Sequence, residues 1–388
     1  MNAFDRLLDA GIKAGAAPGA TAVVVNRRGP VWEGAAGERE LDSGVTMTND
    51  TVGAIFSMTK ALTGVAAMQL VEQNRLSLDA PAGEVIPWLG EVQVLEGFDD
   101  SGEPVTRPPR TPVTLRNLLT HTSGFVYEMW NADTVAWREK TGTPSFSTAL
   151  NAGMRAPLAF DPGTAWEYGI GIDWVGKMVE AVSGQSLGDY FAEHVTGPMR
   201  MHDTAFDLSP SMAERAAGMH ARAPDGSLIP INVSPPPNPE YQMGGGGLNG
   251  TMRDYGRFLQ MMLNDGELDG QRLLKAKTVE MMATNQMGDL QMKPLKTVMP
   301  NLSNDADLFP GEPKSWGLTF MINESPLETG RPAGGLMWAG LANSYYWIDR
   351  KNGIGGAYMS QILPFADAKS MNLFMDIERE AYRQLAQS

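Results

Sequence analysis

The chain contains one serine that is followed three positions later by a lysine, Ser57 with Lys60. No other serine in the sequence has a lysine at this spacing. Residues 61–70 are rich in small apolar side chains and predict a buried helix, on which residues three apart share a face. A desolvated amine in that place can take the serine proton and create a nucleophile. The alternative is that Ser57 caps a helix and Lys60 is a solvated surface charge.

A second serine lies in a Gly-x-Ser-x-Gly pattern, Ser186 within residues 184–188. In α/β-hydrolases this pattern needs a strand before it, because the serine sits on a strand-to-helix turn. Here the preceding residues, 173–182, have a helical pattern. Ser186, with Asp189 three positions later, is typical of a helix N-cap with an acidic first turn. We therefore predict a structural role for Ser186.

The composition describes an acidic globular protein of 388 residues, with 31 Lys and Arg against 45 Asp and Glu and a net charge of −14. A nucleic-acid binder needs a basic face, so this balance argues against nucleic acid as a partner and against an anionic membrane surface. With 43% hydrophobic residues the chain can bury a large core. Cysteine is absent, which excludes disulfides and thiolate chemistry. The four histidines show no metal-ligand spacing, and no metal site is predicted.

The sequence shows no targeting or membrane signal. Residues 1–15 are amphipathic and carry acidic groups early, unlike the basic and then apolar regions of a signal peptide. No stretch approaches 18 consecutive apolar residues, so we expect no membrane-spanning segment. We predict a cytoplasmic location.

The two ends of the chain predict one antiparallel sheet. A helix is expected at 3–14 and another at about 367–386, each with apolar residues at helical spacing. Strands are expected between them, with turn residues such as Arg350 to Gly353 separating the last two. These strands are 21–25, 30–37, 315–322, 335–340, 343–349 and 354–363.

The middle of the chain is mainly helical in pattern and carries long Pro- and Gly-rich loops. The two longest loops are 100–113 and 228–250, and the second contains Pro235 to Pro237 and Gly244 to Gly247. The predicted fold is α/β (α+β type), an antiparallel sheet flanked by terminal helices with an inserted, mainly helical lobe. The expected helices are 58–75, 114–120, 172–183, 186–195 and 252–264. The predicted lobes are 1–85 with 310–388 (α/β) and 86–309 (mainly helical), with the active site between them.

Four motifs occur in order: Ser57 to Lys60, LLTHTSGF at 118–125, DPGTAWEY at 161–168, and GGGGL at 244–248. In this order they resemble the serine β-lactamase-like superfamily. Within it the chain looks most like the family VIII carboxylesterases, relatives of class C β-lactamases and penicillin-binding proteins. The resemblance runs from about residue 5 to 380 and implies a β-lactamase/transpeptidase-like fold.

The resemblance implies roles for three residues. Ser57 would be acylated, Lys60 would assist proton removal, and Tyr168 matches the tyrosine that faces both. The penicillin-recognising pattern Tyr-x-Asn is replaced here by Tyr168-Gly169-Ile170, so the amide that would contact a β-lactam side chain is missing. Without the resemblance, Tyr168 would be read as a packed aromatic residue with a hydrogen-bonded hydroxyl.

The third motif of the β-lactamases, Lys-Thr-Gly on a strand, is best matched by Trp338-Ala339-Gly340. With Trp338 in place of lysine, a cation that would pair with a substrate carboxylate becomes an apolar surface. The alternative is that Trp338 is a core residue of a strand. By the same resemblance, the N–H of Leu341 would hold an oxyanion together with that of Ser57.

Further residues are predicted to form the walls of the substrate site. The predicted substrate contacts are Trp338, Gly340, Phe125, Tyr127 and Tyr241. Some of these aromatic residues can equally belong to the core. His121 is expected to hold a loop in place, although a role as the base remains an alternative to Lys60.

Taken together, we predict a serine carboxylesterase that hydrolyses short to medium acyl esters through an acyl-enzyme on Ser57. The substrate would be a small-molecule ester, and no metal or organic cofactor is required by this chemistry. The alternatives are a β-lactamase, a D-amino-acid peptidase or amidase, or an acyltransferase with the same residues, and a non-catalytic binding relative. The sequence does not predict the oligomeric state.

Overall fold

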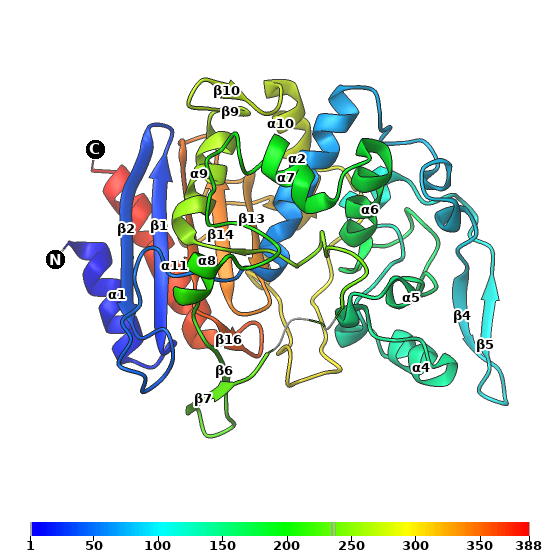
Figure 1. Ribbon diagram of the computed structural model, residues 1–388, viewed down its shortest axis with the longest axis horizontal. Coiled ribbons are helices and arrows are strands. Elements are labelled where there is room, and N and C mark those ends of the chain that lie inside the picture. Colours follow the sequence, from blue (N-terminus) through cyan, green and yellow to red (C-terminus); the bar gives the residue numbers. More distant parts are fainter. Residues whose placement is uncertain (1, 234–235, 237, 388) are drawn as a thin grey trace.

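The largest element of the computed structural model, which describes residues 2–233, 236 and 238–387, is a seven-stranded antiparallel sheet (Figure 1). The strand order is β11-β12-β13-β14-β15-β1-β2, so strands from both ends of the chain share one sheet. This arrangement confirms the predicted fold class. The strands are β1 (Gly19–Asn26), β2 (Gly29–Gly37), β11 (Lys314–Trp316), β12 (Met321–Asn323), β13 (Gly335–Gly340), β14 (Ser344–Asp349) and β15 (Ile354–Met359).

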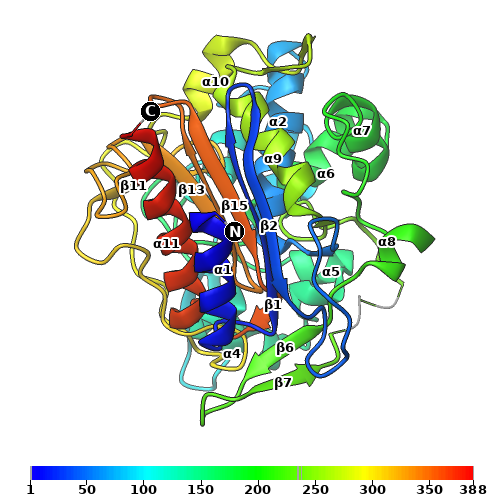
Figure 2. The ribbon, with the colours of Figure 1, turned by 90° about the vertical axis from the view of Figure 1, so that its left-hand side faces the viewer.

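Helices cover both faces of this sheet, which is why every residue of β13, β14 and β15 is buried. The terminal helices α1 (Ala3–Lys13) and α11 (Ala368–Leu385) lie side by side on one face, as Figure 2 shows. They approach so closely that a Cβ atom on Gly11 would lie 2.5 Å from Leu373. On the other face are α2 (Thr59–Glu72) and α9 (Met252–Leu263).

The remaining helices lie in the middle of the sequence, and α4, α5 and α6 gather away from the large sheet in Figure 1. Although α9 also falls in the predicted helical lobe, it packs on the sheet, where Gly256 lies against Val23. The division into two lobes stays a prediction. The other helices are α3 (Leu115–Leu119), α4 (Ala132–Thr141), α5 (Asn151–Met154), α6 (Gly171–Ser183), α7 (Leu187–His194), α8 (Pro210–Glu214) and α10 (Ala276–Met282).

Several sheets of two or three strands lie apart from the large sheet. The pair β3–β8 leads into the segment that carries Ser57, and the β6–β7 hairpin projects from the body of the molecule (Figures 1 and 2). Their strands are β3 (Gly53–Ala54), β4 (Val94–Phe98), β5 (Pro104–Arg107), β6 (Met219–Arg222), β7 (Leu228–Ile231), β8 (Asn249–Gly250), β9 (Glu267–Leu268), β10 (Gln271–Arg272) and β16 (Ile362–Leu363).

Two predicted strands are wrong as single elements. The segment 354–363 divides into β15 and β16, which belong to different sheets. The other is 315–322. It forms two antiparallel strands, β11 and β12, because the chain reverses between Gly317 and Phe320. Thr319 in this turn has a φ of +80°, and a Cβ on Gly317 would lie 2.1 Å from the carbonyl oxygen of Met282. The continuous apolar pattern hid this turn, since both strands and the turn are buried.

The two long loops predicted from the sequence contain strands as well. Within 100–113, residues 104–107 form β5, which pairs with β4. Within 228–250, β7 and β8 occupy the two ends. Pro235 and Pro237 of that segment lie outside the described residues.

In the described ranges, every helix falls short of the length and apolar character that a helix needs to cross a bilayer.

Candidate active site

Ser57 lies in a single 3₁₀ turn, η1 (Phe56–Met58), directly before α2. Its neighbour Phe56 has a φ of +43°, a left-handed backbone that side chains other than glycine seldom adopt. The turn is fixed from two sides: the N–H of Ile55 donates to the carbonyl of Leu248 at 3.0 Å, and Gly340 packs on the carbonyl of Ile55. Strained turns of this kind persist where the surrounding structure holds them, often at functional sites.

Lys60 lies one helical turn beyond Ser57 and is completely buried. Its Nζ is 3.1 Å from Ser57 Oγ, 2.9 Å from Tyr127 Oη and 2.5 Å from the carbonyl oxygen of Gly245. The alternative of a solvated surface charge is therefore wrong for Lys60. The helical spacing of the two residues produces the predicted contact.

The environment of Lys60 favours its neutral form. Burial lowers the pKa of the amine to about 7, although the nearby negative charge of Asp173 opposes this shift. A neutral amine has two N–H bonds and one lone pair. The carbonyl of Gly245 can only accept, and the hydroxyl of Tyr127 can accept the second N–H. The lone pair is then left for the proton of Ser57.

Asp173, in the first turn of α6, supports this arrangement from behind. Its Oδ1 accepts a hydrogen bond of 2.9 Å from the N–H of Gly245, whose carbonyl contacts Lys60. A Cβ on Gly245 would lie 2.4 Å from Asp173 Oδ2, so this close approach requires glycine. Burial raises the pKa of the Asp173 carboxyl, and the charge of Lys60 opposes that rise.

Tyr168 is buried beside the same two residues. Its hydroxyl accepts the indole N–H of Trp338 at 2.9 Å, and the side chain of Ser57 lies close enough to act on the pKa of the phenol. Lys60 Nζ lies 4.8 Å from the centre of the Tyr168 ring. Burial raises the pKa of the phenol, while the interactions with Ser57 and Trp338 act in the opposite direction. The structure thus brings Ser57, Lys60 and Tyr168 together.

Trp338 is both a core residue of a strand and a neighbour of the site, so both interpretations of the sequence apply to it. It is a buried residue of β13, 3% exposed, and its ring packs on Tyr168 and on Trp316. Its N–H nevertheless faces the hydroxyl of Tyr168. Where the β-lactamase pattern has a lysine, this chain therefore provides a neutral hydrogen-bond donor.

Leu341 follows β13 directly, at the place where the strand meets the serine turn. A Cβ on Gly340 would lie 2.3 Å from the carbonyl oxygen of Ile55, so glycine allows the strand end to touch the segment before Ser57. Within the part of the chain that the structure describes, the N–H groups of Ser57 and Leu341 have no assigned acceptor. Both groups are therefore available as donors.

The predicted aromatic walls are placed differently from expectation. Phe125 is 1% exposed and packs against Trp88 and Trp174, so it is a core residue rather than a wall of the site. Tyr127 contributes its hydroxyl to Lys60 instead of an apolar surface. Tyr241 is also buried, and its hydroxyl donates to the carbonyl of Phe146 at 3.4 Å.

Ser186 is an N-cap, as predicted. Its side chain accepts from the N–H of Asp189 at 3.1 Å, and the residue directly precedes α7. His121 is buried, and its Nδ1 accepts from the N–H of Gly169, the residue after Tyr168.

Sequence reasoning missed Asp173, Gly245 and the polar role of Tyr127. Asp173 carried a weak signal, because it is an acidic residue five positions after Tyr168 in the first turn of a predicted helix. The glycine run at 244–247 signalled a close backbone approach, but its partner lies far away in the sequence.

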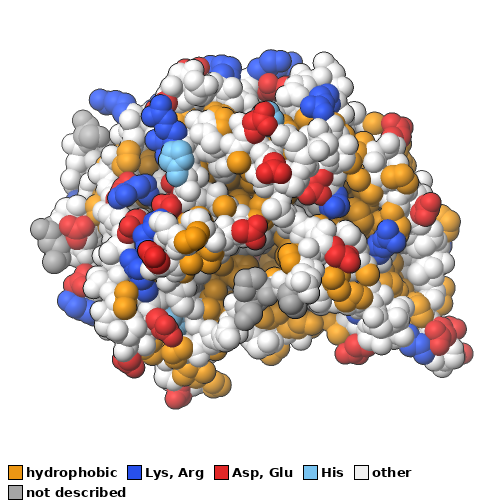
Figure 3. Space-filling model, in the orientation of Figure 1, with side chains coloured by type: hydrophobic (Ala, Val, Ile, Leu, Met, Phe, Trp, Pro, Cys, Tyr) orange, Lys and Arg blue, Asp and Glu red, His pale blue; other side chains and the backbone are white. Residues whose placement is uncertain are grey.

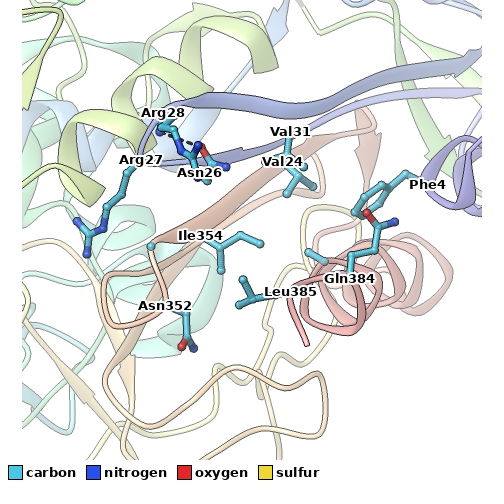
Figure 4. Close-up of a pocket in the computed structure, with 12 residues that line it drawn as sticks. Phe4, Val24, Asn26, Arg27, Arg28, Val31, Asn352, Ile354, Gln384 and Leu385 are labelled. Atoms are coloured by element: carbon cyan, nitrogen blue, oxygen red, sulfur yellow. Dashed lines mark hydrogen bonds between the residues drawn. The ribbon is translucent and has the colours of Figure 1, made fainter. Parts of the chain in front are cut away.

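On the surface, hydrophobic side chains gather in a hollow near the middle of the face shown in Figure 3. A separate pocket of about 460 Å³ lies at the β1–β2 turn (Figure 4). Phe4, Val24 and Ile354 contribute to its apolar floor, with Arg28 at the turn. Its lining residues, all described, do not include Ser57, Lys60 or Tyr168, so we do not assign the chemistry to it.

Comparisons with known proteins identify the family of the chain. The family model described as Beta-lactamase matches residues 4–378. A monacolin J acid methylbutanoyltransferase of Aspergillus terreus is 32% identical over 87% of this chain and 83% of its own length. A lovastatin esterase of Penicillium rubens is 29% identical over 98% of both chains. The structure of unliganded simvastatin synthase from Aspergillus terreus superposes with a TM-score of 0.85 at 27% identity, covering 99% of this chain and 98% of that one.

Proposed function

The chain belongs to the Beta-lactamase family, and from this premise we propose that it is an enzyme that cleaves carboxylic esters through an acyl-enzyme on Ser57. The observation that carries the proposal is the 3.1 Å contact between Ser57 Oγ and the buried amine of Lys60. A buried amine with a pKa of about 7 is poised to accept a proton near neutral pH.

In the acylation step, the neutral amine of Lys60 takes the proton of Ser57 as Oγ bonds to the ester carbonyl carbon. The carbonyl oxygen becomes an oxyanion, which the N–H groups of Ser57 and Leu341 would hold. The bond between the carbonyl carbon and the alkoxy oxygen then breaks. The leaving oxygen receives a proton through the hydroxyl of Tyr168, which Lys60 re-protonates, and the alcohol departs.

In the second step, an incoming oxygen nucleophile attacks the acyl-enzyme. Tyr168 and Lys60 take its proton and return a proton to Ser57 Oγ as the acyl–serine bond breaks. Water releases a carboxylic acid, whereas an alcohol yields a new ester. The same residues therefore serve hydrolysis and acyl transfer.

The groups around Lys60 fix the orientation of its amine. Tyr127 and Gly245 occupy its N–H groups, and Asp173 holds the backbone of Gly245. This arrangement keeps the lone pair directed at Ser57, and we assign Tyr127 and Asp173 positioning roles.

We propose uncharged esters with a short to medium acyl group as substrates. A penicillin carries a carboxylate. Burying this charge beside Trp338 without a partner costs on the order of several kcal/mol of binding free energy. Ile170 also replaces the amide that β-lactam recognition uses, and it is 1% exposed. The name of one relative, a monacolin J acid methylbutanoyltransferase, supports a short branched acyl group.

Acyl transfer is the second candidate function. It is favoured because the relatives of similar identity include both a methylbutanoyltransferase and an esterase. The two candidates differ only in the acceptor of the acyl group.

The decisive experiment compares Ser57→Ala with Ser186→Ala. We expect Ser57→Ala to abolish hydrolysis of p-nitrophenyl butyrate and Ser186→Ala to retain most of it. A phosphonate inhibitor should label the peptide that contains Ser57. Activity that survives in Ser57→Ala, or label on Ser186, would contradict the proposal.

A substrate panel then defines the reaction. We expect a higher kcat/KM for p-nitrophenyl butyrate than for a chromogenic cephalosporin or a D-amino-acid amide. Adding an alcohol acceptor and measuring the ratio of new ester to free acid separates transfer from hydrolysis. A kcat/KM ratio of aryl ester to cephalosporin below one would reject the ester preference.

A further inference from the structure

His121 is bonded to the chain on both sides of Tyr168. Its backbone carbonyl accepts the N–H of Glu167 at 3.0 Å, and its imidazole Nδ1 accepts the N–H of Gly169 at 3.3 Å. The residues directly before and after Tyr168 are therefore attached to one and the same residue. Such a double attachment limits how far the backbone at Tyr168 can move.

The imidazole ring also contacts the phenol ring itself. The centres of the His121 and Tyr168 rings are 4.5 Å apart, and the planes are tilted by 57°. Trp316 packs nearly perpendicular to the imidazole at 5.0 Å, and His121 is only 1% exposed. The phenol thus has a buried and closely packed neighbour on the side of His121.

The backbone of His121 is held in an unusual conformation. Its φ is +58°, in the left-handed region, where histidine and asparagine occur more readily than most residues. The adjacent Thr122 accepts the N–H of Gly163 at 2.7 Å, so the turn is bonded again to the segment that leads to Tyr168. A residue in this backbone region persists when its surroundings hold it.

The protonation of the imidazole follows from its contacts. Because Nδ1 accepts a hydrogen bond, the ring proton of the neutral form is on Nε2. Nε2 is buried and has no hydrogen-bond partner among the described residues. Burial, and then the positive charge of Lys60, hold the pKa of His121 well below its ordinary value. The rings packed against the imidazole are those of Tyr168, Trp166 and Trp316, and the charge that acts on it is that of Lys60.

We propose that His121 is a positioning residue for Tyr168. It holds the backbone on both sides of Tyr168 and so keeps the phenol hydroxyl at Ser57. His121 itself takes no part in proton transfer. The proposal rests on the proposed function of Ser57 and Tyr168. It also removes His121 as the alternative to Lys60 for the base.

The kinetic test uses two variants that both tolerate a positive φ. His121→Gly keeps the backbone carbonyl but removes the imidazole, whereas His121→Asn restores an acceptor near the position of Nδ1. We expect His121→Gly to lower kcat for p-nitrophenyl butyrate by about tenfold or more with little change in KM, because small displacements of reacting groups are costly. We expect His121→Asn to recover most of the lost kcat. The pH dependence of kcat should have the same midpoint in the unaltered enzyme and in both variants.

Three kinetic outcomes would overturn the proposal. The first is a kcat for His121→Gly close to that of the unaltered enzyme. The second is a His121→Asn variant that is no faster than His121→Gly. The third is a changed pH midpoint in either variant, since a shift would identify His121 as a titrating participant.

A second measurement uses the unaltered protein and does not depend on the folding of a variant. Nitrogen NMR of ¹⁵N-histidine-labelled protein should show one of the four imidazoles as a neutral Nε2–H tautomer that does not titrate from pH 5 to 9. An imidazole at His121 that titrates in this range, or that carries its proton on Nδ1, would reject the proposal. The NMR result does not depend on the outcome of Ser57→Ala. Failure of this proposal can therefore be distinguished from failure of the proposed function.

Discussion

The indole N–H of Trp338 donates a hydrogen bond of 2.9 Å to the hydroxyl oxygen of Tyr168. A tyrosine oxygen that gains negative charge during proton transfer is stabilised by such a donor, and the bond lowers the pKa of the phenol. A lysine in this place would add a full positive charge and attract a substrate carboxylate. Trp338 therefore links the role proposed for Tyr168 to the proposed preference for uncharged esters.

Replacing Trp338 with phenylalanine removes the donor and keeps most of the ring volume. We expect kcat for p-nitrophenyl butyrate to fall by about tenfold to a hundredfold, because the phenol loses a hydrogen bond that favours its charged form. The matched control is Trp316→Phe, since Trp316 donates its N–H to the carbonyl of Leu119 instead. Equal losses in the two variants would indicate that packing, not the donor, explains the effect.

The pH dependence of acylation should report the titration of Lys60. Its pKa of about 7 means that the amine is protonated below pH 7 and neutral above it. Only the neutral amine can accept the proton of Ser57, so the rate of labelling by a phosphonate should rise with pH with a midpoint near 7. Measuring the second-order labelling rate from pH 5 to 9 checks this. A rate that does not change across this range would exclude Lys60 as the titrating base.

Asp173→Asn tests the charge behind the lysine. The negative charge of Asp173 raises the pKa of Lys60, so its removal should lower that pKa and move the labelling midpoint to a lower pH. The amide oxygen of asparagine can still accept the N–H of Gly245. Asp254→Asn is the control, because Asp254 is another largely buried carboxyl, with a pKa raised by burial to about 6, that bonds to Thr204 and Asp203 instead. A midpoint that moves upward in Asp173→Asn would contradict the assigned role.

The sequence predicted the parts of the site that depend on local geometry. Ser57 and Lys60 meet because a helix places residues three apart on one face. The N-cap at Ser186 was predictable for the same reason, since a cap involves neighbours in the chain. The antiparallel pairing of β14 and β15 was predictable because the turn residues Arg350 to Gly353 separate two apolar runs.

The parts that could not be predicted depend on segments far apart in the sequence. The carbonyl of Gly245 reaches Lys60 only after α6 and the glycine run pack together. Tyr127 was read as an apolar wall because nothing in its neighbourhood shows that its hydroxyl meets an amine 67 positions earlier. The turn at Gly317 was missed because its residues are as apolar and buried as the strands beside it.

Alanine substitutions at two adjacent glycines of the run 244–247 should differ in their effects on activity. A Cβ on Gly245 would lie 2.4 Å from Asp173 Oδ2, whereas the nearest atom to a Cβ on Gly246 would be the carbonyl carbon of Phe56 at 3.8 Å, an ordinary contact. Gly245→Ala must push Asp173 or the backbone aside and so displace the carbonyl that holds Lys60. We expect kcat to fall by about a hundredfold in Gly245→Ala, while Gly246→Ala stays near the unaltered rate. Steady-state kinetics on p-nitrophenyl butyrate, with thermal unfolding to confirm that both variants fold, decides the matter. A Gly245→Ala enzyme as fast as Gly246→Ala would show that the carbonyl of Gly245 does not need to stay at 2.5 Å from Lys60.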